Sequence, residues 1–144
     1  MIPRLAVQET LKPEYTLFLD ALAKTPFSGE MRPDFASRLL MSTDNSIYQI
    51  LPQAIVFPRT EEDLVHLFKL ANQDRFKSIA FSPRGGGTGT NGQSLSDGII
   101  IDCSKYMNQI LELNLEQGWV RVQPGVILDQ LNAYLKPDGV FFAP

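Results

Sequence analysis

The chain has 144 residues, enough for one domain with a sizeable core, and 44% apolar and 20% charged residues are ordinary for a globular protein. A net charge of −3 argues against nucleic-acid binding, and one cysteine and one histidine argue against a disulfide or a metal site. No apolar run reaches the roughly 18 residues of a membrane span, and no signal peptide is visible, so a cytoplasmic protein is expected.

The first 40 residues are expected to form an N-terminal helical arm, the first twelve of them loosely held. Pro13, followed by an acid, predicts a helix start, because proline is tolerated in the first turn and an acid suits the helix dipole there. The apolar stripe expected on this helix is Leu17, Phe18, Ala21 and Leu22. A loop hinged at Gly29 is expected over residues 27–32, and a second helix over residues 34–40.

The next segment alternates polar clusters with apolar runs. Residues 42–46 are polar and offer helix caps, so residues 47–51 are expected to form a single helical turn. Ala54 to Phe57 predicts a short buried strand that Pro58 ends. Thr60 and three following acids predict a capped helix. Its expected buried stripe is Leu64, Leu67, Phe68 and Ala71.

Short strands dominate the second half. They are expected at residues 79–81, 99–102, 110–114 and 119–123, with turn residues between the later ones. Cys103 is expected to be a small packed thiol. Pro124-Gly125 ends the last strand and precedes a helix with Leu128, Leu131 and Leu135 on one face. The chain ends on the apolar run 140–142, so we expect it to be a fragment of a longer protein.

The most informative stretch is the glycine-rich segment that follows residues 79–81. Glycine lets the backbone approach a ligand closely, and successive N–H groups in such a loop can converge on an anion. Threonine hydroxyls, an amide and an arginine add further donors. The segment is therefore predicted to be a diphosphate cradle made of Arg84, Gly85, Gly86, Gly87, Thr88, Gly89, Thr90, Asn91 and Gly92.

Other glycine-rich loops fit the segment less well. A Walker A loop ends in Gly-Lys-[Ser/Thr], and this segment has no lysine. Residues 87–92 match G-x-G-x-x-G, but residues 93–98 do not carry the apolar period of the helix that a Rossmann motif must open. No downstream lysine or His-Arg-Asp set supports a kinase loop. A flexible linker is the remaining alternative, but the segment interrupts a strand-rich region.

Four ordered motifs resemble a known family. They are residues 54–64 (AIVFPRTEEDL), 83–92 (PRGGGTGTNG), 99–108 (IIIDCSKYMN) and 120–126 (VRVQPGV). Together they are similar to FAD-binding domains of the p-cresol methylhydroxylase (PCMH) and vanillyl-alcohol oxidase type, over residues 41–144. Residues 41–48 resemble the bacterial FAD-linked dehydrogenases similar to D-2-hydroxyglutarate and D-lactate dehydrogenases.

The resemblance implies an α+β fold, the first subdomain of a PCMH-type domain, with a small sheet flanked by helices at residues 41–144. It implies that main-chain N–H groups from Arg84 to Thr90, and then Asn91 and Gly92, hold the FAD diphosphate. Some relatives attach the flavin to a histidine in or near this loop; here the loop has none, so FAD is expected to be non-covalent. Relatives of this group also carry an iron–sulfur region, which would make a 4Fe-4S cluster a cofactor of a longer protein.

The implied activity is oxidation of a 2-hydroxy acid by hydride transfer to the flavin, a chemistry that the cofactor carries. No catalytic residue is predicted here, because Asp44 and Asp102 are expected to have capping or turn roles. The isolated chain is expected to be inactive, to expose a partner face and to self-associate. In the cell, the protein is expected in the cytoplasm or peripheral to the membrane. The alternatives are a non-catalytic nucleotide- or phosphate-binding module, an interaction domain, and another flavin oxidoreductase subclass of this fold.

Overall fold

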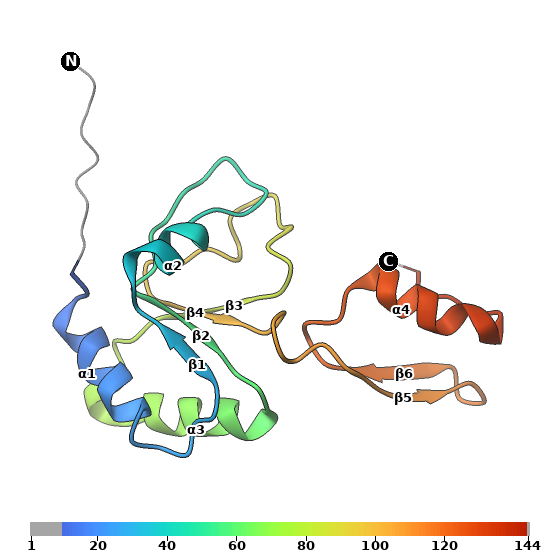
Figure 1. Cartoon of the computed structure of the whole chain (residues 1–144), viewed down its shortest axis with the longest axis horizontal. Helices are drawn as coiled ribbons and strands as arrows, with labels where there is room; N and C mark the ends of the chain where they lie inside the picture. The colour runs from blue at the N-terminus through green and yellow to red at the C-terminus, as the bar shows by residue number, and fades with distance from the viewer. Residues whose placement is uncertain (1–9, 144) are drawn as a thin grey trace.

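A four-stranded mixed sheet forms the body of the computed structural model, which describes residues 10–143 (Figure 1). The strand order is β1-β2-β4-β3, and β4 runs parallel to both β2 and β3, whereas β1 is antiparallel to β2. The last of the four strands in the sequence, β4, therefore lies between β2 and β3. The bounds are β1 Glu30–Arg32, β2 Ala54–Phe57, β3 Phe81–Arg84 and β4 Ile99–Asp102.

The two inner strands are buried on both faces. All four residues of β2 and all four of β4 are buried, and Ile55 lies opposite Ile100 in the register. Such continuous apolar runs, rather than an alternating pattern, are typical of parallel strands that are covered on both sides. The strands predicted at 54–57 and 99–102 are confirmed. Burial and β-branched side chains both favour strand structure there.

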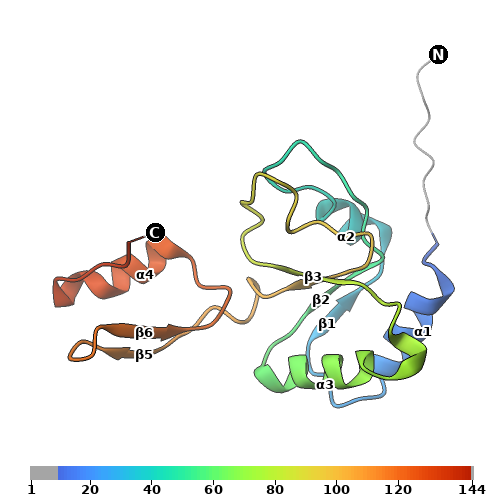
Figure 2. The ribbon, with the colours of Figure 1, turned by 180° about the vertical axis from the view of Figure 1, so that it is seen from behind.

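Helices α1 (Pro13–Leu22) and α3 (Glu61–Ala71) cover one face of the sheet (Figure 2). Phe18, which is fully buried, meets the rings of Phe76 and Phe81 edge-on at centroid distances of 5.2 and 5.4 Å. The predicted stripe on α1 was partly wrong, since Leu17 is 63% exposed. The core is instead formed by Tyr15 and Leu19, which lie two positions before and after Leu17 and therefore on the other side of the helix.

Helix α3 begins as its sequence predicts. Thr60 Oγ1 accepts a hydrogen bond from the N–H of Asp63 at 3.2 Å, and the Asp63 carboxylate accepts from the N–H of Thr60 at 3.3 Å, which completes a capping box. Asp63 is buried and also accepts from the N–H groups of Ser28 and Arg59. These hydrogen bonds lower the pKa of Asp63 against the opposing effect of burial.

The other face of the sheet is covered more thinly. Ile55, Phe57 and Ile100 pack there against Met41 and Tyr106, and α2 (Phe35–Leu40) lies beside β2. Helix α2 was predicted, and Asp34 caps it by accepting from the N–H of Ser37 at 2.9 Å. Apolar side chains that remain exposed near this face are Leu39, Leu40, Ile47 and Tyr48.

Two local predictions were wrong. Glu30–Arg32, expected in a loop, is an edge strand, because backbone pairing with β2 holds three residues that have no strand pattern of their own. A Cβ on Gly29 would collide with the carbonyl oxygen of Phe57, so glycine allows the backbone to pack closely there. Residues 47–51 form no helical turn, because a bridge between Thr43 and Gln49 closes residues 42–50 into a loop.

A hairpin and a helix form a second unit beside the sheet (Figure 1). Strands β5 (Ile110–Asn114) and β6 (Trp119–Val122) pair antiparallel with a register shift between Ile110 and Glu112, and α4 (Leu128–Leu135) follows. Short 3₁₀ turns occur at Asp74–Phe76 and Lys136–Asp138. The α+β class with a small sheet flanked by helices is confirmed. The division of the chain at residue 40 stays a prediction, although α1 shares the core of the sheet.

Candidate functional site

The predicted cradle begins at the carboxyl end of β3. Arg84 is the last residue of that strand rather than part of the loop; it lies opposite Asp102 of β4, and its carbonyl accepts from the N–H of Cys103 at 2.9 Å. Asp102 in turn accepts from the N–H of Ser104 at 2.8 Å, the turn role expected of it. The arginine is thus anchored on the sheet, and residues 85–98 leave from it to return as β4.

The side chain of Arg84 folds back over Gly87. Gly87 has φ +65°, a left-handed conformation that residues with a Cβ rarely adopt. A Cβ built on Gly87 would lie 2.7 Å from Cζ of Arg84, so the guanidinium occupies the space that a side chain would need. Glycine is therefore favoured here by the backbone conformation, and any side chain would displace the guanidinium of Arg84.

Arg84 has an unused donor. Its Nη1 is buried and has no hydrogen-bond partner among residues 10–143, and the guanidinium forms no ion pair with a carboxylate in that range. Leaving such a group unsatisfied costs about 1–3 kcal/mol, and more when it is charged. A guanidinium presents a planar fork that suits phosphate oxygens. This donor is therefore suited to an anion that enters beside Gly87.

Unpaired main-chain donors follow Arg84 in the loop. In the described part of the chain, the N–H groups of residues 86–90 donate to no protein acceptor. A run of free N–H groups in a glycine-rich turn forms an anion-binding concavity without any charged side chain. The loop and Arg84 together thus supply both the neutral donors and the positive charge that a diphosphate needs.

A second loop, residues 42–50, lies against the glycine loop (Figure 2). The N–H of Asn45 donates to the carbonyl of Gly87 at 3.2 Å, and Ser94 Oγ donates to Asp44 Oδ2 at 3.0 Å. The two loops and the end of α2 border a shallow, open hollow of about 400 Å³ lined by Leu40, Thr43, Asp44, Asn45, Arg84, Gly87 and Thr88. Three of the nine predicted cradle residues therefore line one hollow: Arg84, Gly87 and Thr88.

Sequence reasoning missed the contribution of residues 42–50. The polar cluster was noticed, but it was interpreted as a set of helix caps. Asp44 does have a local role, since its Oδ1 accepts from the N–H of Ser46 at 2.8 Å. Hydrogen bonding by the side chain of Ser46 is the main cause that lowers the pKa of Asp44; the N–H of Ser46, the hydroxyl of Ser94 and the positive charge of Arg84 act in the same direction. Its position beside the glycine loop depends on tertiary structure, which no local pattern encodes.

The other predicted residues lie along the loop outside the hollow. Gly85 faces the carbonyl oxygen of Pro124, so the turn after β6 packs beside the start of the loop. The N–H of Asn91 is already used by Gln93 Oε1 at 3.0 Å. Gly92 has φ +74° and faces the ring of Tyr48. Contact of the nine residues with a cofactor stays a prediction, and Asn91 is the least available donor among them.

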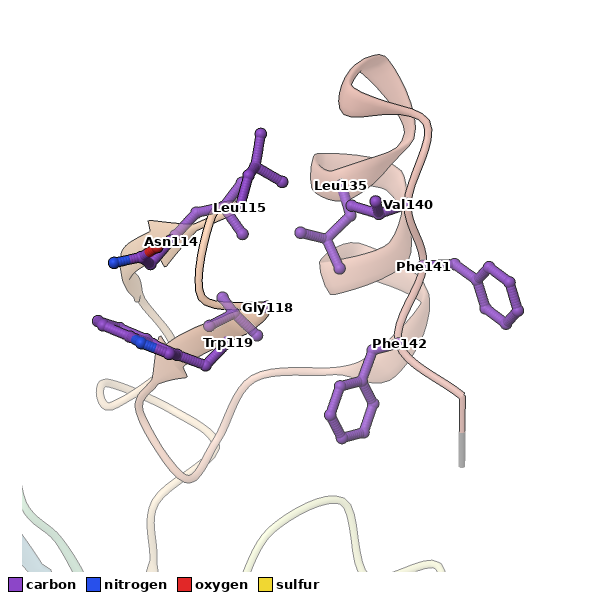
Figure 3. Close-up of a pocket in the computed structure, with 10 residues that line it drawn as sticks. Asn114, Leu115, Gly118, Trp119, Leu135, Val140, Phe141 and Phe142 are labelled. Atoms are coloured by element: carbon purple, nitrogen blue, oxygen red, sulfur yellow. The ribbon is translucent and has the colours of Figure 1, made fainter.

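A larger hollow of about 420 Å³ lies between the β5–β6 hairpin and α4 (Figure 3). Leu115 and Trp119 line it from the hairpin, and Leu135, Val140 and Phe142 line it from the helix and the segment after it. Its lining has no charged side chain, so it does not suit a phosphate. It is an apolar surface of the second unit, separate from the hollow beside Arg84.

Ion pairs cluster at the outer edge of the sheet. Glu30 on β1 pairs with Lys105 at 2.9 Å, with Arg32 at 3.2 Å and with Arg59 at 3.6 Å, and accepts from the hydroxyl of Tyr106. The hydrogen bond from Tyr106, followed by that from Lys105, lowers the pKa of Glu30 to about 2. Glu30 is the common partner of these four groups, so the cluster ties β1 to the turn after β4.

Metal ligands do not gather in the described residues. No group of three or more His, Cys, Asp or Glu side chains within residues 10–143 is placed to hold a metal ion. Cys103 is buried, as predicted, and burial raises the pKa of its thiol. Among the helices of the same range, none has the length and apolar character needed to cross a membrane.

Two curated proteins that are similar to this chain carry the same name. D-2-hydroxyglutarate dehydrogenase of Escherichia coli K12 is 54% identical over 144 residues, which are 100% of this chain and 14% of that protein. The protein of that name from Haemophilus influenzae is 56% identical over 132 residues, 91% of this chain and 13% of that protein. The chain thus spans about one seventh of the length of these curated relatives.

Solved structures share the fold. An alkyldihydroxyacetonephosphate synthase structure aligns with a TM-score of 0.73 at 21% identity, over 96% of this chain and 27% of that one. The family described as the FAD binding domain matches residues 52–144, a range that includes β2, the glycine loop, β4 and the second unit. The chain therefore belongs to the FAD-binding domain family, of the PCMH type that its four motifs resemble.

Proposed function

We propose that this chain forms the diphosphate-binding part of a flavin-dependent oxidoreductase that oxidises a D-2-hydroxy acid of the 2-hydroxyglutarate or lactate type. The observation that carries the proposal is the buried, unpartnered Nη1 of Arg84 beside the free N–H groups of residues 86–90. The substrate class rests on the relatives named D-2-hydroxyglutarate dehydrogenase and on a mitochondrial D-lactate dehydrogenase of Kluyveromyces lactis, 37% identical over 95 residues.

The residues present fit the diphosphate of FAD. Arg84 would supply a charge-assisted hydrogen bond and the glycine loop would supply neutral donors, whereas a Cβ on Gly87 would displace the guanidinium. The cofactor, when bound, supplies the hydride acceptor. In this chain, the described residues would bind and orient it; the groups that take the proton and hold the substrate are proposed to lie in the rest of the protein.

An absorption spectrum tests the proposal. The protein as its gene encodes it should be purified with the bands of an oxidised flavin. Anaerobic addition of D-2-hydroxyglutarate or D-lactate should bleach these bands, whereas the L-enantiomers should not. Flavin without bleaching by any 2-hydroxy acid would instead indicate another flavin oxidoreductase subclass. Protein that neither contains nor binds flavin would refute the proposal and favour a non-catalytic or interaction module.

Three further properties belong to the same proposal. FAD is held non-covalently, because the glycine loop contains no histidine, and acid precipitation should release all of it into the supernatant. A 4Fe-4S cluster is bound by the part of the relatives' length that this chain does not span, and iron and sulfide analysis of the gene-encoded protein checks this. The protein is cytoplasmic or peripheral to the membrane, which fractionation of the cells would show.

A further inference from the structure

The loop at residues 42–50 holds the glycine loop at three places. Asn45 donates its N–H to the carbonyl of Gly87, and Asp44 accepts from Ser94 at the far end of the glycine loop. Between them, the ring of Tyr48 faces Gly92, where a Cβ would lie 3.1 Å from Cδ2 of the ring. The two loops therefore behave as one structure, and the conformation of the cradle depends on residues 42–50.

The loop at residues 42–50 is itself fixed. The N–H of Ile50 donates to the carbonyl of Ser42 at 2.9 Å, which closes the loop, and Ser42 is fully buried. At its tip, both carboxylate oxygens of Asp44 accept hydrogen bonds, one from the N–H of Ser46 and one from Ser94. A side chain held at both oxygens has little rotational freedom. Asp44 is therefore a fixed negative charge.

This charge lies where an anion is expected to bind. Asp44 and Arg84 line the same hollow, and no other charged side chain lines it. A carboxylate beside a diphosphate would weaken binding by repulsion if it had no other effect. It would strengthen binding if it held the guanidinium in place, because a long arginine side chain otherwise loses conformational entropy when the ligand binds.

We propose that Asp44 is a positioning residue that acts through Arg84: its fixed carboxylate keeps the guanidinium over Gly87, with Nη1 available to the diphosphate. The inference rests on the proposed FAD site and deepens it. It assigns to residues 42–50 a share in cofactor affinity without a direct contact to the cofactor. The two charges line the same hollow and attract each other through space, without a direct ion pair, while the hydrogen bonds from Ser46 and Ser94 fix the carboxylate.

A double-mutant cycle tests the inference. Apo-protein of the gene-encoded chain is titrated with FAD, and flavin fluorescence gives the Kd for wild type, Asp44→Asn, Arg84→Gln and the double variant. Asp44→Asn should raise the Kd about tenfold, a coupling within the range measured for interacting side chains. In the Arg84→Gln background the same change should not raise the Kd, because only the repulsion between Asp44 and the diphosphate is then removed. Riboflavin, which lacks the diphosphate, should bind wild type and Asp44→Asn equally.

Asp97→Asn is the matched control. Asp97 is an exposed acid near the end of the same connection, where it pairs with Lys12 at 3.5 Å, so its variant removes one negative charge away from the hollow and should leave the Kd unchanged. Asp44→Asn that binds FAD more tightly would overturn the inference and make Asp44 a simple opposing charge. Equal effects of Asp44→Asn with and without Arg84 would also overturn it.

Ser94→Ala gives an independent measurement if Asp44→Asn does not fold. It removes the hydrogen-bond donor to Asp44 Oδ2 and keeps the negative charge of Asp44. The Kd for FAD should then rise about threefold when Arg84 is present and should not rise in the Arg84→Gln background. Such a non-additive result is expected of coupled residues. An additive result would again refute positioning. Wild-type protein that fails to bind FAD would refute the proposed function itself, which separates the two failures.

Discussion

Replacing Gly87 by alanine should weaken FAD binding far more than the same change at Gly86. Gly87 has φ +65°, and an L-residue in the left-handed region costs about 1–2 kcal/mol, which should appear as lost stability of the apo-protein. The new Cβ would also collide with the guanidinium of Arg84, whose flexible side chain can rotate away. That rotation relieves the clash, but it removes the proposed phosphate donor from the hollow.

The two effects predict different magnitudes in two assays. Chemical denaturation of the apo-protein should show a loss of about 1–2 kcal/mol for Gly87→Ala, from backbone strain alone. FAD affinity should fall by more than about tenfold, since loss of a charge-assisted hydrogen bond is worth roughly 1.5–3 kcal/mol and 1.4 kcal/mol is a factor of ten. Binding should therefore suffer more than stability.

Gly86→Ala is the matched control one residue earlier. A Cβ on Gly86 would meet Thr88 Cγ2 at 3.5 Å, an ordinary van der Waals contact, and Gly86 is not among the glycines with positive φ. This variant should change stability by less than about 0.5 kcal/mol, as surface substitutions usually do, and should retain FAD. Equal losses of FAD in the two variants, or full retention of FAD in Gly87→Ala, would refute the reasoning about Arg84.

Three further predictions follow from the same structure. Arg84→Gln should raise the Kd for FAD more at low salt than at high salt, because salt screens a charge that is only partly buried, and titrations at two ionic strengths check this; an unchanged Kd would give Arg84 a structural role. Glu30 has a folded pKa of about 2 against an ordinary 4.5, so its contribution to stability is present above about pH 4.5 and is lost as the pH falls towards 2. The stability difference between wild type and Glu30→Gln should therefore shrink over that window in urea titrations, and a difference independent of pH would contradict the assignment. The 144-residue chain alone should melt cooperatively, self-associate through its exposed apolar surface and bind FAD more weakly than micromolar, since burial of the flavin ring is worth several kcal/mol at about 25 cal/mol per Å². Sedimentation and FAD titration test this, and submicromolar binding would show that the site is complete within these residues.

The helices and inner strands could be predicted because their signals are local. The capping box of α3 needs only Thr60 and Asp63, and the buried runs of β2 and β4 are visible as uninterrupted apolar residues. The edge strand β1 could not be predicted, because pairing with Phe57 and its neighbours, rather than a pattern in residues 30–32, holds it. The exposure of Leu17 was missed for a similar reason, because the position of α1 on the sheet decides which side of the helix faces the core.

The candidate site divides in the same way. Glycines and an arginine in one short segment predict an anion cradle from sequence, and the structure adds the unused Nη1 of Arg84. Residues 42–50 could not be assigned to it, because they lie about forty residues upstream and reach Gly87 only once α2 and β2 are in place. The sequence shows the negative charge of Asp44, but it does not show that Asp44 lies beside Arg84.

The connection from β3 to β4 limits how this loop can vary in length. The strands are parallel neighbours, and such a pair needs a connection of about a dozen residues or more to bring the chain back to the starting edge. Residues 85–98 provide fourteen positions and contain no helix. Deleting even a few of them should therefore prevent β4 from entering the sheet between β2 and β3. Loop-shortening variants should fail to fold, whereas substitutions at the same positions affect the ligand first, so truncation is a poor way to remove cofactor binding from this scaffold.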